Sequence, residues 1–305
     1  MDQFPKVSIC MITYNHENFI EEAINSVLMQ ECNFEIELII VNDCSPDKTD
    51  DVIKIILENN TKASKIKYFK QQKNVGVMSN FAFALKKCSG KYIAICEGDD
   101  YWTDPLKLTK QFNFLENNPK YIIHSSNAIQ LSDNFDLNYK PVLKDITDKT
   151  FILDDFLIAN NIITCTVMFR NDKIEFPSDF YKVTFGDWML YVILLFTSNK
   201  KAYRTTECLS VYRIHNGGVM SNLNDLKYFK SHINQILIIK KYLNIKRFSN
   251  SAIEILNQYS LESFRIEINK RMYKEALRTL FGNLYCSKFK IPFKKYAQSV
   301  KNYYL

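Results

Sequence analysis

The chain has 305 residues, of which 47% are hydrophobic and 24% are charged, and its formal net charge is +7. This length and composition suit one large domain with an appendage, or two domains. Gly and Pro, at 7 each, are too scarce for a collagen-like or low-complexity chain, and no run of about 18 apolar residues predicts a transmembrane helix.

The cysteines and the first residues indicate the compartment. The 8 cysteines form no CxxC pair, and Cys10 and Cys96 lie inside apolar runs. This favours reduced thiols in the cytosol over disulfides or a zinc site. The first five residues are acidic rather than basic, so we expect no signal peptide and a cytoplasmic protein.

Strand and helix signals alternate through the first hundred residues. Apolar runs predict strands at 7–12, 38–41, 66–69 and 92–96, and helical spacing predicts helices at 19–28 and 78–87. Ser45 followed by Pro46 predicts a further helix with Ser45 as its N-cap. Apolar strands that alternate with helices predict an α/β fold with a Rossmann-like, mostly parallel sheet flanked by helices.

Polar segments follow three of these predicted strands. They are residues 13–15, 42–45 and 97–100. Ligands of such sheets bind outside the carboxyl ends of the strands, so we expect the three segments to share one edge.

The segment Glu97-Gly98-Asp99-Asp100 places three carboxylates within four residues. Carboxylates this close repel one another, and a hard divalent cation such as Mg²⁺ or Mn²⁺ relieves the repulsion. The alternative interpretation is a solvated acidic turn.

The character of the chain changes near residue 223. Beyond it we find helical periodicity, which predicts a helical C-terminal region at 223–305 after a domain at 1–222. Residues 240–305 hold 14 Lys and Arg against 4 Glu, a net charge of +10. The basicity therefore belongs to the C-terminal region.

Several ordered motifs resemble those of family-2 glycosyltransferases, which have the GT-A fold. The segments are VSICMITYNHENFIEEAINSVLMQ, ELIIVNDCSPDKT, NVGVMSNFAFALKKCSGKYIAICEGDD, FGDWMLYVILL and LSVYRIHNGGVMS. The resemblance covers roughly residues 5–222. It implies a nucleotide-sugar half at about 1–100, an acceptor half at about 101–222, and an inverting reaction.

The resemblance also implies roles for individual residues in binding the donor. Tyr14 offers an aromatic face to the nucleobase, or packs on the core. Asp43 accepts a hydrogen bond from the uracil imide, or caps a helix. Asn80 matches a downstream Asn of the family, but Ser79 stands where a basic residue often precedes it. The full implied donor-binding set is Thr13, Tyr14, Asn15, Asp43, Asn74, Gly76, Asn80, Glu97, Gly98 and Asp99.

The metal and catalytic positions follow from the same resemblance. The family usually has Asp at the position of Glu97, and its metal contact comes from the later acids, here Asp99 or Asp100. His215 matches a loop histidine that reaches the metal in some members, although the four histidines show no metal-ligand spacing in sequence. Asp187 matches the catalytic base, and the alternative is a simple helix N-terminal acid. Trp188 either lines the acceptor pocket or only packs.

We therefore expect a metal-dependent hexosyl- or N-acetylhexosaminyltransferase that uses Mn²⁺ or Mg²⁺. Its donor is a UDP-sugar, with dTDP left open, and its acceptor is a glycan or a lipid-linked glycan in bacterial surface polysaccharide synthesis. A sugar-phosphate nucleotidyltransferase is one alternative, but residues 7–20 lack its Gly- and Arg/Lys-rich phosphate loop. A non-enzymatic, membrane-associated nucleotide-sugar-binding protein is the other.

The basic C-terminal region predicts contact with an anionic membrane surface, at the inner face of the cytoplasmic membrane. Lysines alternate there with aromatic residues at near-helical spacing. Packing on the catalytic domain and a homodimer interface are the alternatives, and no nucleic-acid motif accompanies the charge. The residues concerned are Phe281, Tyr285, Phe289, Phe293 and Tyr296, with Lys288, Lys290, Lys294 and Lys295.

Overall fold

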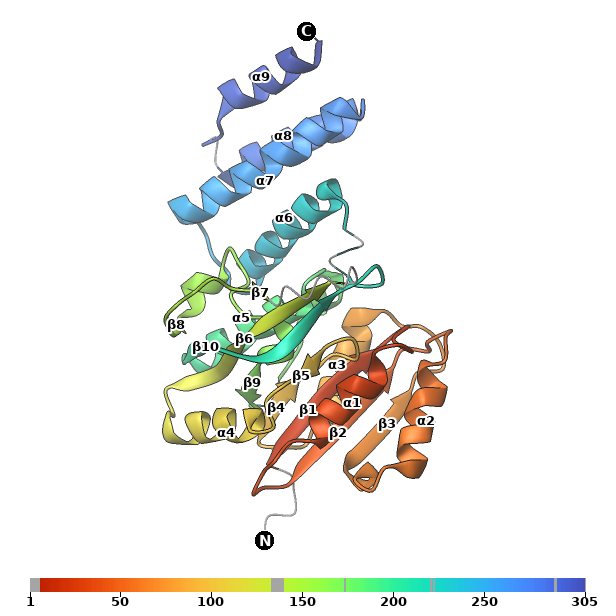
Figure 1. Ribbon diagram of the computed structural model, residues 1–305. Helices are drawn as coiled ribbons and strands as arrows, with labels where there is room; N and C mark the ends of the chain where they lie inside the picture. Colours follow the sequence, from red (N-terminus) through yellow and green to blue (C-terminus); the bar gives the residue numbers. More distant parts are fainter. Residues whose placement is uncertain are drawn as a thin grey trace. The chain divides into compact units, whose positions relative to one another are not determined.

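The structure is a computed structural model that describes residues 6–132, 140–172, 174–219, 221, 223–287 and 290–304 (Figure 1). The expectation for residues 1–5 and the membrane contacts predicted for Lys288 and Phe289 lie outside these ranges. The chain divides into two compact units. The α/β unit comprises Met1–Phe156, Asn160–Lys182 and Gly186–Gly217, and the helical unit comprises Leu157–Ala159, Val183–Phe185 and Gly218–Leu305. The domain boundary predicted between residues 222 and 223 stays a prediction.

The first half of the α/β unit is a parallel sheet, as its apolar runs predict. Its strands are β1 (Val7–Thr13), β2 (Ile36–Asn42), β3 (Ile66–Lys70) and β4 (Tyr92–Ile95), in the order β3-β2-β1-β4. All seven residues of β2 are buried, which explains why its sequence is continuously apolar at its centre. The fold class predicted from the sequence is confirmed.

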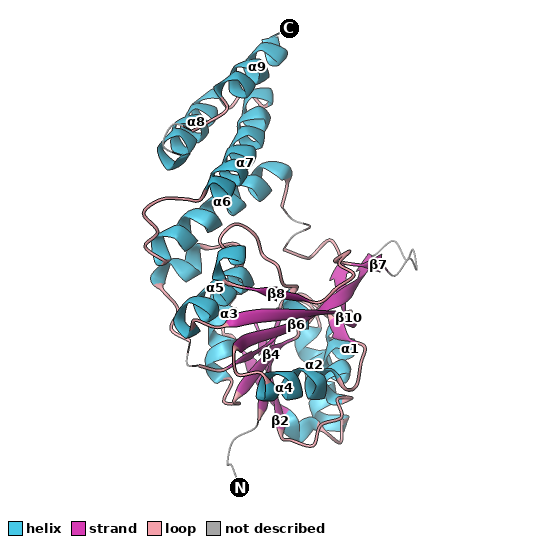
Figure 2. Ribbon diagram, turned by 90° about the vertical axis from the view of Figure 1, so that its left-hand side faces the viewer, coloured by secondary structure: helices cyan, strands magenta, loops and turns pink. Residues whose placement is uncertain are grey.

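Three helices connect these strands. They are α1 (Ile20–Leu28), α2 (Thr49–Asn59) and α3 (Val77–Lys87). Residues of α1 and α2 share one apolar core with the strands, while the crossover from β3 back to β4 takes α3 to the other face (Figure 2). The helices therefore cover both faces of the sheet and leave its strand ends open.

The start of α2 differs from the prediction. The helix begins at Thr49 rather than at Ser45, and Ser45 is not its N-cap. The Asp47 carboxylate instead accepts hydrogen bonds from the backbone N–H and the hydroxyl of Thr49, and the Ser45 hydroxyl donates to Asn42 Oδ1. The segment before the helix is thereby a loop at the strand end.

The second half of the unit extends the sheet with mixed pairing. Strand β9 (Met168–Arg170) lies antiparallel between β4 and β6 (Tyr121–Ser132), and β10 (Lys201–Ile214) runs parallel to β6. The remaining elements are β5 (Tyr101–Trp102), α4 (Lys107–Asn117), β7 (Lys140–Pro141), β8 (Lys149–Phe151), α5 (Gly186–Ser198) and the 3₁₀ turns Ala63–Lys65, Leu153–Phe156, Thr164–Thr166 and Ser178–Lys182. The end of β10 carries the residues that complete the site.

The helical unit contains α6 (Asp225–Tyr242), α7 (Asn250–Asn269), α8 (Tyr273–Ser287) and α9 (Phe293–Tyr304). Asn224 and Ser249 cap α6 and α7, because their side chains accept from the backbone N–H three residues later. A small apolar core joins α7, α8 and α9 and includes Phe264 and Tyr296. Within the described residues, no helix combines the length and apolar character that crossing a membrane requires.

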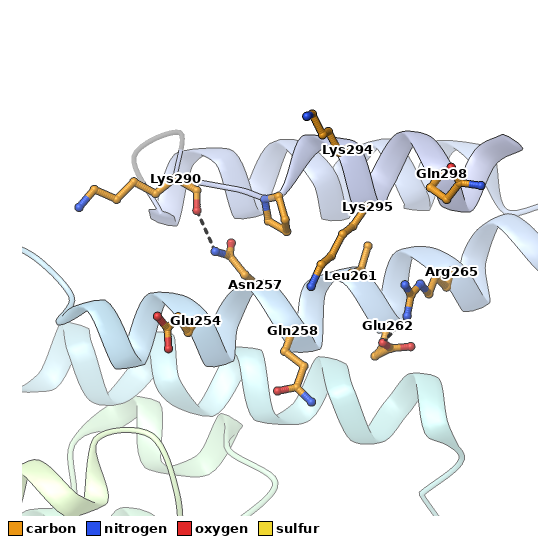
Figure 3. Close-up of a pocket in the computed structure, with 11 residues that line it drawn as sticks. Glu254, Asn257, Gln258, Leu261, Glu262, Arg265, Lys290, Lys294, Lys295 and Gln298 are labelled. Atoms are coloured by element: carbon orange, nitrogen blue, oxygen red, sulfur yellow. Dashed lines mark hydrogen bonds and ion pairs between the residues drawn. The ribbon is translucent and has the colours of Figure 1, made fainter. Parts of the chain in front are cut away.

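A groove of about 840 Å³ separates α7 from the start of α9 (Figure 3). Most of the residues that line it are polar or charged, and Asn257 Nδ2 donates to the backbone carbonyl of Lys290 across it at 2.8 Å. The Lys295 side chain points into the groove, whereas Lys294 points away from α7. Tyr296 is buried beside Phe264, so it does not belong to the membrane-facing set predicted from the sequence.

Candidate active site

The ends of β1, β2 and β4 meet at one edge of the sheet, as the topology predicts. The backbone N–H of Asp43 donates to the carbonyl of Thr13, and that of Gly98 donates to the carbonyl of Ile12, both at 3.0 Å. The backbone N–H of Asn15 donates to Ser45 Oγ at 3.0 Å. These bonds hold the three polar segments side by side.

Two further hydrogen bonds link the loop after β1 to the loop after β2. His16 N–H donates to Thr49 Oγ1, and Glu17 N–H donates to Asp47 Oδ2, each at 2.9 Å. Asn15 has a φ of 65°, which lies in the left-handed region that Asn tolerates. Tyr14 is 42% exposed, so its ring is presented at the strand end instead of packing in the core.

Asp43 organises the turn at residues 74–76. Its two carboxylate oxygens accept from the backbone N–H groups of Val75 at 2.8 Å and of Gly76 at 3.0 Å. Gly76 has a φ of 87°, which only glycine adopts without strain. Asn74 Oδ1 also accepts from Gly76 N–H. Burial raises the pKa of Asp43, and the two backbone hydrogen bonds oppose that rise.

Asn80 does not face the ligand edge. It is buried, its Nδ2 donates to the Val41 carbonyl, and its Oδ1 accepts from Gln71 Nε2. The predicted donor contact of Asn80 is therefore wrong, because its amide ties α3 to the end of β2 and to Gln71, directly after β3. A sequence motif does not distinguish a buried amide from one that faces a ligand.

Gly98 allows the acidic turn to approach the loop after β1. A Cβ at this position would lie 2.7 Å from Thr13 Oγ1 and 3.0 Å from His16 Nδ1. The close contact of Thr13 and Gly98 thus sets the distance between the ends of β1 and β4. Burial, together with the charges of Asp99, Asp100 and Asp187, raises the pKa of Glu97 well above its ordinary value.

Asp99 lies between two histidines that come from opposite ends of the α/β unit. Its Oδ2 is 3.1 Å from His215 Nε2 and 3.5 Å from His16 Nε2. One ligand atom from each of the three residues lies within 4.8 Å of the others. Sequence spacing did not identify His16 as a partner of Asp99. The one signal for it was its place in the loop after β1, a strand that ends at the ligand edge.

This cluster fits a divalent cation by its donor set. Imidazole is a common ligand of first-row divalent metals, and a carboxylate suits Mn²⁺ and Mg²⁺. Burial lowers the pKa of His16 despite the opposing charge of Asp99, which favours the neutral imidazole that ligates metal. Asp100 Oδ2 is buried and has no hydrogen-bond partner among the described residues, so a further acceptor oxygen lies in the same turn.

Arg213 fixes the acidic turn from the side of β10. Its backbone N–H donates to Asp100 Oδ1 at 2.8 Å, and its guanidinium donates to the Asp99 carbonyl at 2.7 Å. The guanidinium also pairs with Glu22 and lies over the Tyr101 ring. These bonds occupy its guanidinium within the protein, so Arg213 is a positioning residue for the two aspartates.

Asp187 lies in the first turn of α5. Its Oδ2 accepts from Asn160 Nδ2 at 2.7 Å and from Thr164 Oγ1 at 2.9 Å. Burial raises the pKa of Asp187, while the backbone N–H of Trp188 and these two side chains oppose the rise. The two donors hold the carboxylate in one orientation, which a simple helix N-terminal acid does not require.

Trp188 only packs. It is 1% exposed, and its indole Nε1 donates to the Phe156 carbonyl at 2.7 Å. The prediction that Trp188 lines an acceptor pocket is wrong, because α5 turns this side chain into the interior of the unit.

The sheet, with ligand groups at the ends of β1, β2 and β4, is that of a GT-A type protein. The model of the family "Glycosyl transferase family 2" matches residues 8–174. The chain belongs to this family.

Two relatives in sequence and one solved structure illustrate the similarity. A protein of Mycobacterium tuberculosis (strain ATCC 25618 / H37Rv) is 32% identical over 220 residues, which are 70% of this chain and 60% of that protein. The Escherichia coli protein WfaP, named UDP-Glc:alpha-D-GlcNAc-diphosphoundecaprenol beta-1,3-glucosyltransferase, is 30% identical over 244 residues, which are 77% of this chain and 85% of WfaP.

The solved structure is that of Staphylococcus aureus TarS 1–349 in complex with UDP-GlcNAc. It superposes with a TM-score of 0.67 at 17% identity and covers 98% of this chain and 89% of TarS 1–349. At this identity the likeness concerns the fold. The chain spans 60% of the length of the mycobacterial relatives that it matches.

Proposed function

We propose that the protein is an inverting glycosyltransferase that moves a hexosyl or N-acetylhexosaminyl group from a UDP-sugar to an acceptor hydroxyl. The observation that carries this proposal is the meeting of Asp43, Asp99 and His215 at one edge of the sheet, together with a half-buried carboxylate at Asp187 that two side chains orient. The name of WfaP and the ligand of the TarS structure support a UDP-sugar donor.

The donor nucleotide would lie along the ends of β1, β2 and β4. The exposed Tyr14 ring offers a stacking face for the base. Asp43 keeps the turn at 74–76 closed and has oxygen lone pairs left to accept from the uracil imide, because each of its oxygens holds one backbone N–H. The same imide occurs in dTDP, and assay of both nucleotides distinguishes them.

Asp99, His215 and His16 would hold Mn²⁺ or Mg²⁺ beside the diphosphate. A bound divalent cation neutralises charge on the diphosphate as the nucleotide leaves. Gly217 N–H donates to His215 Nδ1 at 3.2 Å, which leaves the proton on Nε2, facing Asp99. Ligation through Nε2 therefore requires the other tautomer of His215, with its proton on Nδ1 and without the hydrogen bond from Gly217. Glu97 would contact the ribose or a water of the cation.

Asp187 would act as the general base. The acceptor hydroxyl gives its proton to the Asp187 carboxylate as its oxygen attacks the anomeric carbon. The bond from that carbon to the β-phosphate oxygen breaks, and its electron pair stays with the departing UDP. Attack from the face opposite the leaving group inverts the anomeric configuration. The raised pKa of Asp187 strengthens it as a base.

We further propose that the acceptor is a glycan or lipid-linked glycan of a bacterial surface polysaccharide, handled at the cytoplasmic side of the membrane. The name of WfaP, which includes a diphosphoundecaprenol acceptor, supports the lipid-linked acceptor.

One assay separates the proposal from its alternatives. UDP release from a panel of UDP-sugars, measured with and without Mn²⁺, is expected for a glycosyltransferase, because such enzymes also hydrolyse the donor slowly. A nucleotidyltransferase would release pyrophosphate from a nucleoside triphosphate, and a binding protein would release nothing. Absence of UDP release with every donor and every acceptor glycan would refute the proposal.

A further inference from the structure

Helix α8 exposes a regular stripe of aromatic and basic side chains. Lys274, Arg278, Phe281 and Tyr285 follow one another at steps of four, three and four residues, which places them on one helix face. The buried residues of α8, among them Ala276 and Asn283, lie on the opposite face, toward the rest of the helical unit.

The aromatic members of the stripe are far from buried. Phe281 is 62% exposed and Tyr285 is 86% exposed. Exposed rings of this size on successive turns of a helix indicate an interaction surface rather than scattered surface apolarity. Among the described residues, neither Lys274 nor Arg278 forms an ion pair, so both cations remain available to a partner.

The start of α9 has the same character. Phe293 is exposed there, and Lys294 points away from α7 (Figure 3). The groove between α7 and α9 is a weaker candidate, because Glu254 and Glu262 line it together with the lysines. The four residues of the exposed stripe include no acid, and Glu275 is the one acid in the first turn of α8 beside them.

We propose that the α8 stripe, formed by Lys274, Arg278, Phe281 and Tyr285, is a contact surface for an anionic phospholipid bilayer. Aromatic rings favour the headgroup level of a bilayer, and Lys and Arg bind the lipid phosphates. The net charge of +10 over residues 240–305 is complementary to such a surface. This inference goes beyond the proposed function and does not depend on it.

A second copy of the chain fits the stripe less well. A two-fold contact would bury Lys274 and Arg278 of one copy against the same stripe of the other, where no acid of the stripe would pair with them, and burying an unpaired charge opposes association. Single-stranded nucleic acid also stacks its bases on aromatic rings and binds cations through its phosphates, but no recognition motif accompanies the stripe. Both are outcomes that the experiment distinguishes.

The test is sedimentation of the full chain with vesicles of phosphatidylcholine alone and of phosphatidylcholine mixed with phosphatidylglycerol, at low and high salt. Two double variants alter the stripe: Phe281→Ser with Tyr285→Ser, and Lys274→Glu with Arg278→Glu. Ile55→Ser with Ile146→Ser is the matched apolar control, because these residues of the α/β unit are 58% and 93% exposed. Lys86→Glu with Lys144→Glu is the matched charge control.

We expect the wild-type protein to bind only the anionic vesicles and to detach at high salt. The charge-reversal pair is expected to weaken partitioning at least about tenfold, since each basic residue near such a surface adds roughly fivefold. The serine pair is expected to weaken it several-fold, and both controls are expected to bind as wild type. Unchanged thermal unfolding and UDP release would show that a stripe variant is folded.

Three outcomes would overturn the proposal. Vesicle binding that is equal in the stripe variants and the controls would assign the contact elsewhere. Absence of binding at low salt, together with a wild-type dimer that the stripe variants disrupt, would identify a second copy as the partner. An oligonucleotide that displaces the protein from vesicles and loses affinity in the stripe variants would identify nucleic acid.

Discussion

Asp99 Oδ2 lies 3.1 Å from His215 Nε2, although the two residues are 116 positions apart in the chain. Asp99 lies in the turn after β4, and His215 follows β10. Their contact therefore joins the first and second halves of the α/β unit at the ligand edge. Arg213 reinforces this contact, because its backbone binds Asp100 and its side chain binds the Asp99 carbonyl. The acidic motif is therefore held from both halves of the sheet.

The histidines should determine metal affinity. His16→Ala and His215→Ala are each expected to raise the Kd for Mn²⁺ at least about tenfold, since loss even of groups that support ligands has this effect. Calorimetric titration of Mn²⁺ measures the affinity directly. His232→Ala, in α6, is the control and should bind Mn²⁺ as wild type does. Wild-type affinity in both site variants would remove the metal from this cluster.

Chelation should abolish UDP release, and added Mn²⁺ or Mg²⁺ should restore it. Asp99→Asn keeps the shape of the side chain but removes the charge that a cation requires. It should therefore weaken UDP binding in the presence of Mn²⁺ and change it little in EDTA. Full activity in excess EDTA would contradict the metal assignment.

Asp187→Asn should abolish base catalysis while leaving donor affinity nearly unchanged. The amide cannot take the proton of the acceptor hydroxyl, so kcat should fall at least about 10²-fold, the usual contribution of general base catalysis. Steady-state kinetics and UDP titration measure the two quantities. Asp179→Asn is the control, because Asp179 forms an ion pair with Lys182. If instead Asp179→Asn is inactive and Asp187→Asn is not, the base has been assigned to the wrong residue.

Thr164→Val should shift the pH dependence of kcat. Burial raises the pKa of Asp187, and the hydrogen bond from Thr164 opposes that rise by favouring the charged form. Loss of this donor should raise the pKa further, so activity would be lost at a higher pH as the solution is acidified. The measurement is the acidic limb of the pH–kcat profile. A uniform decrease at every pH, without a shift, would indicate only a structural role.

Asp43→Asn should open the turn at residues 74–76. An amide replaces one acceptor oxygen by a donor that faces a backbone N–H, and an unsatisfied buried group costs about 1–3 kcal/mol. UDP affinity should therefore fall by roughly 5- to 150-fold, which calorimetry measures. Asp172→Asn, on an exposed residue, is the control. Unchanged UDP affinity would separate this turn from the nucleotide site.

Asp50 should contribute stability that depends on pH. Burial disfavours its charge, but hydrogen bonds from Lys70, Tyr68 and Lys54 outweigh it and lower the pKa of Asp50 to about 2. A lowered pKa stabilises the folded state above the ordinary value of 3.8, and this contribution is lost as the pH falls toward 2. Urea unfolding should show this loss in wild type and in Asp51→Asn, but not in Asp50→Asn. The same pH dependence in Asp50→Asn would contradict the assignment.

Much of the first half of the fold follows from local sequence pattern. The runs that form β1, β2 and β4 are apolar because both faces of the sheet are covered, and burial on both faces leaves a continuous apolar segment in the sequence. The polar residues that end these strands could be assigned to one edge from topology alone. The start of α2 could not, because Asp47 accepts from Thr49 and displaces the local cap signal of Ser45.

The roles of several side chains depended on packing that no local pattern records. Asn80 and Trp188 match motif positions, yet both are buried and bonded within the protein. His16 carries no spacing signal, yet it lies beside Asp99 because the loops after β1 and β4 are neighbours across Gly98. Strand and helix periodicity arises from residues a few positions apart, so a sequence displays it directly. The distance between two side chains at a site depends on the path of the whole intervening chain, and that path is set by the packing of the complete sheet.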